Sequence, residues 1–193
     1  MEKKFLRKQG LRLRDAMLPA DRDQKSTIIC DKLISLDIYQ QAKHIMMFAA
    51  FGSEIDLTQL REHAWAHQKI IYLPVVDQNS GYILPIETNS LKELKRSAYG
   101  ILEPSLSKYQ EDTLRNIDLV LVPAIFFDLQ GYRLGYGAAY YDYLLPRLSS
   151  HCYKLGVGFD AQIISFLPRE PHDVPLDALL SNRQWIEVNQ YAK

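Results

Sequence analysis

The sequence has little cysteine and no long apolar segment. Cys30 and Cys152 are its only cysteines, and they lie far apart and outside any CxxC pattern. Neither a disulfide framework nor a zinc site is therefore predicted. No stretch approaches the roughly 20 apolar residues that a membrane helix requires, and the N-terminal segment lacks the apolar centre of a signal peptide. We expect a cytoplasmic protein.

An excess of charge of one sign is also missing. Lys and Arg together number 23, and so do Asp and Glu, which gives a formal net charge of +0. No overall field would attract nucleic acid or an anionic membrane, so any bound anion must be held locally. The expected partners are small molecules, and we expect a monomer rather than an oligomer. His63 and His67 are four residues apart but lack a third ligand or a glutamate motif, so a metal site is not indicated there.

What the chain does have is the pattern of one α/β domain over residues 1–193, without repeats or linkers. Helices are predicted at 2–18, 22–36, 56–67 and 90–96, and strands at 44–50, 69–76, 81–87, 118–123 and 153–159. The run 118–123 has the β-branched, apolar composition of a central strand, and 81–87 that of an edge strand. Strand–helix–strand order implies right-handed crossovers, and hence three αβα layers around a mainly parallel sheet. Such folds bind ligands beyond the carboxyl ends of their strands.

The predicted helices also have expected faces and ends. In the first helix, Leu6, Leu13 and Met17 form an apolar stripe, and Lys3, Arg7 and Arg14 share an adjoining face (both read from the 3.6-residue period). Pro19 and Asp21 are expected to stop this helix and cap the next. The apolar residues that the second helix should bury are Ile28, Ile29, Leu33 and Leu36.

The segment 131–142 carries the clearest functional signal. It follows strand 118–123 and opens into a helix that should bury Tyr141, Leu144, Leu145 and Leu148, with Pro146 ending or kinking it. Glycines 131, 135 and 137 permit φ > 0, so that successive N–H groups and the helix N-terminus can face an anion. Arg133 offers a fork suited to phosphate, and Asp142, one turn into the helix, is expected to reach a Mg²⁺ that bridges the phosphates. By spacing alone, an ordinary glycine turn with an exposed arginine and a dipole-stabilising aspartate is an equal alternative.

The same segment resembles the signature of the 5-formyltetrahydrofolate cyclo-ligase family. Pro123–Asp128 followed by Gly131–Asp142 is similar to that family's proline-led strand end, F-D and G-x-R-L-G-x-G-x-G-Y-Y-D. The resemblance extends over nearly the whole chain through four further motifs, at Lys3–Arg7, Glu54–Asp56, Gly100–Pro104 and His172–Asp177. The fold that comes with it is Rossmann-like, of the NagB/RpiA/CoA-transferase type.

The resemblance implies a reaction: ATP-dependent closure of 5-formyltetrahydrofolate to 5,10-methenyltetrahydrofolate, with Mg²⁺. Catalysis is assigned to Arg133 and Glu54, and metal binding to Asp142 and Asp177. The folate would contact Glu54, Tyr136 and Tyr140. The residues implied to hold ATP are Lys3, Arg7, Arg133, Leu134, Gly135, Tyr136, Gly137, Ala138, Ala139, Tyr140 and Tyr141.

Each of these roles has a plainer alternative. Lys3 and Arg7 suit a solvated basic face, and Asp177 suits a helix cap. Glu54 lies where the first strand ends, as a ligand contact would, but a loop acid or a helix cap fits there too. For Phe51 and Tyr136, packing on the pterin or the aminobenzoyl ring and ordinary burial are the two alternatives. For His172 we expect a structural hydrogen bond.

The sequence departs from the family pattern at two adjacent positions. Ala139 stands where the family usually has glycine, and Ala138 where it commonly has lysine or glycine. A helical φ at Ala139 would make the alanine harmless, whereas a positive φ would distort the phosphate cradle. Two other functions therefore stay open: a catalytically weakened folate- or nucleotide-binding relative, and a sugar-phosphate or CoA-handling enzyme on a similar scaffold.

Overall fold

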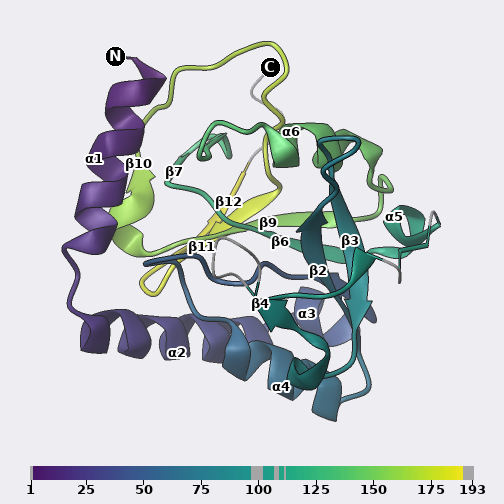
Figure 1. Cartoon of the computed structure of the whole chain (residues 1–193). Helices are drawn as coiled ribbons and strands as arrows, with labels where there is room; N and C mark the ends of the chain where they lie inside the picture. The colour runs from purple at the N-terminus through teal and green to yellow at the C-terminus, as the bar shows by residue number, and fades with distance from the viewer. Residues whose placement is uncertain (1, 97–101, 107–108, 111, 189–193) are drawn as a thin grey trace.

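A seven-stranded sheet forms the centre of the computed structural model, which describes residues 2–96, 102–106, 109–110 and 112–188 (Figure 1). In spatial order its strands are β12 (Trp185–Glu187), β11 (Ala178–Leu180), β9 (Tyr153–Val157), β6 (Leu119–Val122), β1 (His44–Met46), β2 (Ile70–Val76) and β3 (Ile83–Thr88). The five inner strands are mutually parallel, and only β12 and β3 at the edges run antiparallel. The predicted mainly parallel sheet and its edge strand are confirmed.

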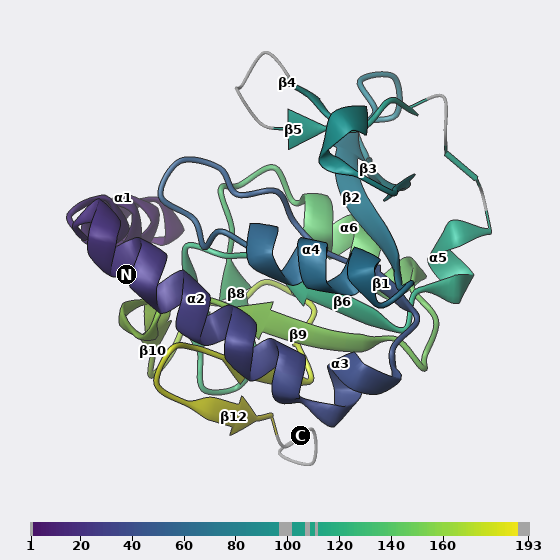
Figure 2. The same ribbon diagram turned by 90° about the horizontal axis from the view of Figure 1, so that it is seen from below.

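Both faces of this sheet are covered by other elements and are buried. Alternate residues of each inner strand point to opposite sides and so belong to different clusters. In β6, Leu119 and Leu121 belong to one apolar cluster, and Val120 and Val122 to another. Helices α2 (Pro19–Ser35) and α4 (Thr58–Ala66) pack on the first side, where Figure 2 shows them lying across the strands. On the second side lie α5 (Thr113–Asn116), α6 (Tyr140–Leu144) and the 3-10 turn Leu145–Arg147.

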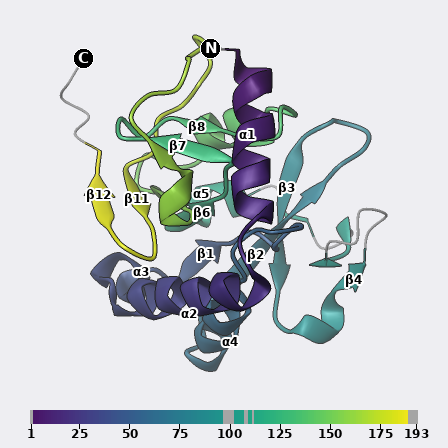
Figure 3. The same ribbon diagram turned by 90° about the vertical axis from the view of Figure 1, so that its left-hand side faces the viewer.

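A second, three-stranded sheet supports the first helix. It consists of β10 (Ile163–Ile164), β7 (Phe126–Asp128) and β8 (Arg133–Leu134), and α1 (Lys3–Asp15) stands beside it in Figure 3. Leu6 packs there in a small cluster with Ile125 and Phe126. A Cβ built on Gly10 would lie 2.4 Å from Ile125 Cγ2, so only glycine lets the helix approach this closely. The small sheet thereby fixes the position of α1.

Several predicted element ends are wrong. The second helix starts at Pro19, its first helical residue, with Leu18 before it, so Asp21 does not cap it. The unpredicted helix α3 (Asp37–Gln41) follows it directly. Instead of a helix at 90–96, a 3-10 turn (Leu91–Glu93) leads into β4 (Lys95–Arg96), which pairs with β5 (Leu102–Glu103). The 3-10 turn Asp160–Gln162 precedes β10. In the motif Gly100–Pro104, residues 100 and 101 lie outside the described residues.

The expected buried faces need two corrections. In α1, Leu13 is 53% exposed, and the buried line is Leu6, Gly10 and Arg14. In α2, Ile29 and Leu33 are buried as predicted, whereas Ile28 is exposed. Of the residues that the helix after the glycine-rich segment should bury, Leu144, Leu145 and Leu148 are buried as expected, and Pro146 lies in the 3-10 turn Leu145–Arg147 that follows α6. Among the helices that the structure describes, none has the length and apolarity needed to cross a membrane.

Candidate active site

A recess opens where three inner strands end at the same edge of the sheet. Because β1, β6 and β9 are parallel, their carboxyl ends bring together residues that are distant in the sequence. The recess is lined by Arg14, Phe48, Glu54, Ile55, Pro123, Ala124, Val157 and Gln162. Its position agrees with the ligand site expected for a sheet of this kind.

Glu54 is the acidic group of the recess. Its side chain is only 7% exposed. Oε2 accepts a hydrogen bond of 3.0 Å from the backbone N–H of Phe51, and Oε1 lies 3.7 Å from Arg14 Nη1. Burial raises the pKa of Glu54 above its ordinary value, although the Phe51 N–H, the Arg14 charge and the Tyr136 hydroxyl each lower it. Glu54 is therefore a buried carboxyl group in the loop after β1, which ends at Met46 and not at the predicted residue 50, and its neighbours stabilise its charge incompletely.

Arg14 faces Glu54 and was not assigned to the site from sequence. It is 2% exposed, and its Nε donates a 2.9 Å hydrogen bond to Ser53 Oγ. Nη2 donates to the hydroxyl of Tyr136, a residue of the glycine-rich segment. Nη1 has no hydrogen-bond partner. The sequence signal was its place on the same helix face as Lys3 and Arg7, but nothing there distinguished a buried arginine from a solvated one.

The glycine-rich segment forms an exposed loop between β8 and α6. Gly131 and Gly137 have φ of 82° and 108°, so both use the conformation that favours glycine. Gly135 does not, and no heavy atom lies within 4 Å of the position its Cβ would take. Leu134 is buried in the cluster beneath α1, so its side chain faces away from the loop surface. The loop surface is therefore made by residues 135–138.

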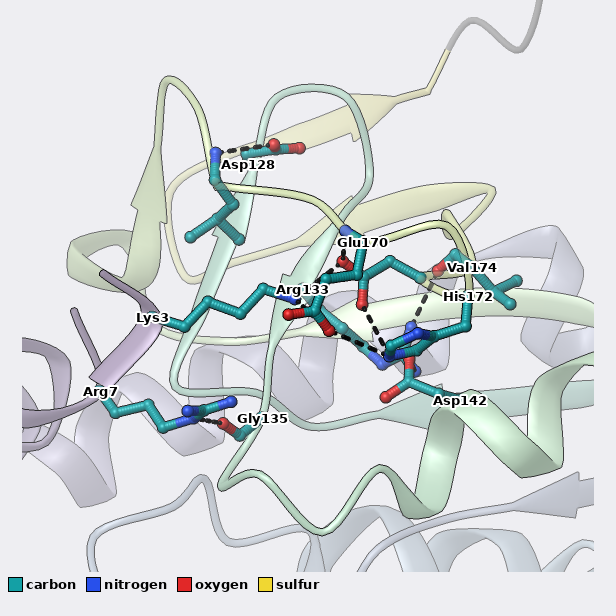
Figure 4. Close-up of polar contacts among 11 residues, drawn as sticks. Lys3, Arg7, Asp128, Arg133, Gly135, Asp142, Glu170, His172 and Val174 are labelled. Carbon is teal, nitrogen blue, oxygen red and sulfur yellow. Dashed lines mark hydrogen bonds and ion pairs between the residues drawn. The ribbon is translucent and has the colours of Figure 1, made fainter. Parts of the chain in front are cut away.

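Arg7 contacts the backbone of this loop. Its Nε donates a 2.9 Å hydrogen bond to the Gly135 carbonyl oxygen, as Figure 4 shows. A Cβ on Gly137 would lie 3.4 Å from the Arg7 guanidinium carbon. Lack of a side chain at Gly137 thus leaves space directly against the charge of Arg7. Arg7 and the glycine loop, which the sequence assigns separately to ATP, are thus in contact.

Ala139 adopts a left-handed conformation, with φ 56° and ψ 15°, at the residue before α6. A residue with a Cβ is disfavoured there. Of the two outcomes considered from sequence, the positive φ is the one that occurs. The loop accordingly keeps a turn suited to glycine while carrying alanine.

Arg133 and Asp142 contact each other. Arg133 Nη2 lies 2.6 Å from Asp142 Oδ1, and Nη1 donates a 2.8 Å hydrogen bond to the Val174 carbonyl oxygen (Figure 4). The Arg133 side chain is only 4% exposed. The predicted phosphate-binding arginine and the predicted metal ligand are therefore neighbours. They form an ion pair in which each neutralises part of the other's charge.

Lys3 reaches from the start of α1 to the segment 170–173. Its Nζ lies 3.0 Å from Asp173 Oδ2 and 3.3 Å from Glu170 Oε2. His172 Nε2 lies 3.2 Å from the same Glu170 oxygen, on an exposed side chain. In the chain as described, Glu170, His172 and Asp173 are the one group of three with ligand atoms mutually within 4.8 Å, but Lys3 already brings a positive charge to it. The predicted metal ligands Asp142 and Asp177 are not part of this group.

Asp177 is hydrogen-bonded to the main chain of Lys154, near the amino end of β9. Its Oδ2 accepts a 2.7 Å hydrogen bond from the N–H of Lys154, and its own N–H donates to the Lys154 carbonyl oxygen. Lys154 lies near the amino end of β9, whereas the recess lies at the carboxyl end. These contacts join β9 to the segment before β11, which is a structural role.

Aromatic side chains flank the loop and the recess. Phe51 and Tyr136 are both partly exposed and pack edge to face, with ring centroids 6.0 Å apart. Tyr140 is half-buried and packs on the apolar cluster beneath α6. The hydroxyl of Tyr141 is buried without a hydrogen-bond partner, and its burial, followed by the charge of Glu54, raises its pKa. The Arg133 charge acts in the opposite direction.

A mainly parallel sheet, a recess at its carboxyl edge and a glycine loop beside a basic helix define an α/β protein of the kind that binds ligands at that edge. Comparisons with known proteins give the family. The model of the 5-formyltetrahydrofolate cyclo-ligase family matches residues 1–182, and the chain belongs to this family.

Relatives from distant organisms agree with this assignment. The 5-formyltetrahydrofolate cyclo-ligase of Haemophilus influenzae is 28% identical over 91% of this chain and 95% of its own length. The mouse enzyme of the same name is 28% identical over 90% and 88%, respectively. The solved structure of Aquifex aeolicus 5,10-methenyltetrahydrofolate synthetase superimposes with a TM-score of 0.85 at 30% identity, covering 100% of this chain and 96% of that one.

Proposed function

We propose that this chain converts 5-formyltetrahydrofolate to 5,10-methenyltetrahydrofolate at the expense of ATP, which becomes ADP and phosphate. The observation that carries the proposal is the position of Tyr136 between the glycine loop and the recess. This residue belongs to the loop beside Arg7, and its hydroxyl binds Arg14 in the recess that holds Glu54. A phosphate cradle and a pocket for an organic substrate are thereby contiguous, as transfer of phosphate between two substrates requires.

The chemistry explains why two adjoining sites are needed. The formyl group on N5 is an amide, and closing the ring onto N10 requires loss of its oxygen. Transfer of the γ-phosphoryl group to that oxygen makes phosphate the leaving group, and N10 then attacks the resulting iminium carbon. The protein has to align the two substrates and neutralise the charge that develops on the phosphoryl oxygens.

For the nucleotide, Arg7 and the exposed loop 135–138 fit an anionic ligand, because a guanidinium and a position without a side chain lie together there. We assign Lys3, Arg7, Arg133 and the loop as far as Tyr141 to ATP. Lys3 is paired with the carboxylate of Asp173, and Arg133 with that of Asp142. Triphosphate oxygens would replace these carboxylates as the partners of the two cations. Leu134 would contribute its backbone only.

For the metal, Asp142 is the better placed of the two predicted ligands. It lies beside Arg133 and the loop, whereas the Asp177 carboxylate is bonded to the backbone of Lys154. Bound Mg²⁺ would neutralise charge on the triphosphate. Glu54, Tyr136 and Tyr140 are assigned to the folate. We also propose the Rossmann-like classification of the fold and a cytoplasmic, monomeric enzyme.

The test is a direct assay. The purified protein is mixed with Mg-ATP and 5-formyltetrahydrofolate, and near-ultraviolet absorbance is followed for the conjugated methenyl product. We expect a band that depends on ATP, with Arg7→Ala raising the KM for ATP and Glu54→Gln raising that for folate. Arg12→Ala, an exposed position on the same helix, is the matched control.

A second function is supported by one observation. The left-handed Ala139 sits inside the loop that must bind phosphate. A relative that holds folate or nucleotide without turnover would give a flat absorbance trace from folded protein that still binds either ligand. Activity at a measurable rate would exclude this alternative.

A further inference from the structure

Arg14 presents an unused hydrogen-bond donor in the recess. Its guanidinium is buried, with Nε bound to Ser53 and Nη2 to Tyr136, but Nη1 has no partner. Leaving a buried charged N–H without an acceptor costs free energy, and buried donors are nearly always satisfied. Nη1 therefore requires either an acceptor from a ligand or some other compensation.

Glu54 does not supply that acceptor. The separation of 3.7 Å between Arg14 Nη1 and Glu54 Oε1 allows attraction between charges but is too long for a hydrogen bond. The second oxygen of Glu54 accepts from the Phe51 N–H. Tyr136 bridges the pair, since its hydroxyl accepts from Arg14 Nη2 and hydrogen-bonds the Glu54 carboxylate, whereas Nη1 itself stays without an acceptor beside that carboxylate.

The other residues that line the recess do not compete for a polar ligand. Gln162 donates through Nε2 to the carbonyl oxygens of Ala124 and Ile125, and its Oε1 accepts from the Phe159 N–H. The side chains that complete the lining are apolar, namely Phe48, Ile55, Pro123, Ala124 and Val157. A neighbouring acceptor and donor on an otherwise apolar wall suit a flat ligand edge that carries an N–H group beside a carbonyl oxygen.

We propose that Arg14 binds the reduced folate directly, by donating a hydrogen bond from Nη1 to a carbonyl oxygen of its pterin portion. This inference rests on the proposed function and adds a residue to its substrate site. The pterin portion of 5-formyltetrahydrofolate has two such oxygens, the ring oxo group and the formyl oxygen. Through Nη2 the same guanidinium holds Tyr136 at the edge of the phosphate loop.

The first test is Arg14→Lys, which keeps the charge but gathers its donors on one nitrogen, so that it cannot occupy the three positions of Nε, Nη1 and Nη2. We expect the Kd and the KM for 5-formyltetrahydrofolate to rise between about tenfold and a hundredfold, the loss expected for one charged hydrogen bond. The KM for ATP should rise less than that for folate, because Arg14 reaches the glycine loop through Tyr136. Arg12→Lys makes the same replacement at an exposed position of α1 and should leave both constants as in the wild type.

The two oxygens are distinguished with tetrahydrofolate, which lacks the formyl group. Equal weakening of both ligands by Arg14→Lys assigns the hydrogen bond to the ring oxo group, and weakening of the formyl ligand alone assigns it to the formyl oxygen. An Arg14→Lys protein with wild-type Kd for both ligands overturns the proposal. Folate binding by a wild-type protein without turnover would instead refute the proposed function, and the comparison of Kd values would still stand.

If Arg14→Lys does not fold, a double variant that makes both Arg14 and Glu54 neutral provides the test. Glu54→Gln combined with Arg14→Met removes both charges of the recess, so neither is left buried alone. The proposal requires this double variant to bind 5-formyltetrahydrofolate at least tenfold more weakly than Glu54→Gln alone, on the same estimate for one charged hydrogen bond. Equal affinity of the two variants would contradict it.

Discussion

We expect the substitution Ala139→Gly to stabilise this protein. Ala139 has φ 56° and ψ 15°, a conformation that costs a residue with a Cβ roughly 1–2 kcal/mol and costs glycine almost nothing. Glycine also makes the unfolded chain more flexible, which offsets about 0.4–1 kcal/mol of the gain. The net increase in the free energy of unfolding should be about 0.5–1 kcal/mol, equivalent to a rise of roughly 1–4 °C in Tm for a chain of this size.

Ala138→Gly is the matched control. It deletes the same methyl group from the neighbouring exposed residue, whose φ is not positive. Only the entropic loss applies there, so Ala138→Gly should lower the free energy of unfolding by about 0.4–1 kcal/mol. Because the entropic terms cancel, the difference between the two variants isolates the strain at Ala139. It should amount to roughly 2–8 °C in Tm, measured by circular dichroism.

Equal destabilisation by both glycines would refute this reasoning, since it would mean that Ala139 carries no left-handed strain. The same two variants also test the phosphate cradle. The backbone at Ala139 already has the conformation that glycine favours. The KM for ATP should therefore be the same in Ala139→Gly and in the wild type, and a large fall in that KM would show that alanine does distort the loop.

Three other perturbations have definite expected outcomes. Gly10→Ala should destabilise the fold by about 1–3 kcal/mol in denaturant titrations, despite better helix propensity, because its Cβ would lie 2.4 Å from Ile125 Cγ2. Asp142→Asn should cost about 2 kcal/mol, because it leaves the buried Arg133 without its carboxylate. Folding raises the pKa of Glu54, so this group contributes to the free energy of unfolding in its protonated form. That contribution is fully present below the unfolded pKa of about 4.3 and is lost as the pH rises through the folded pKa. Unfolding titrations between about pH 4 and pH 8 should thus show Glu54→Gln gaining stability relative to wild type as pH rises, whereas a constant difference would contradict the raised pKa.

The central strands were predictable because their burial is local information. A run such as Leu119–Val122 is apolar at every position, as a strand covered on both faces must be. The small sheet was not predictable in the same way. β8 and β10 have two residues each, too few to show any period. Asp128 holds their connections through hydrogen bonds from the N–H groups of Gln130, Tyr132 and Leu167, the last of which is distant in sequence.

In the site too, residues set by local sequence could be predicted, whereas contacts between distant segments could not. Glu54 was predictable because it follows a buried strand, and the carboxyl edge of a parallel sheet is where ligands bind. Arg14 was not, because a charged helix residue usually faces solvent, and its burial depends on Ser53 and Tyr136. The contact between Arg133 and Asp142 also escaped prediction, since each was assigned separately to a ligand.

The position of helix α1 connects both parts of the site. On one face it carries Arg7 to the glycine loop and Lys3 to the segment 170–173, and one turn beyond Gly10 it carries Arg14 into the recess. Close packing at Gly10 sets the distance of the whole helix from the small sheet. A displacement of α1 should therefore weaken ATP and folate binding together, whereas a change confined to Ala138 and Ala139, which are assigned to ATP only, should affect ATP alone. Comparison of the two KM values in Gly10→Ala would separate these cases, because a rise in only one of them would mean that the helix does not move as a unit.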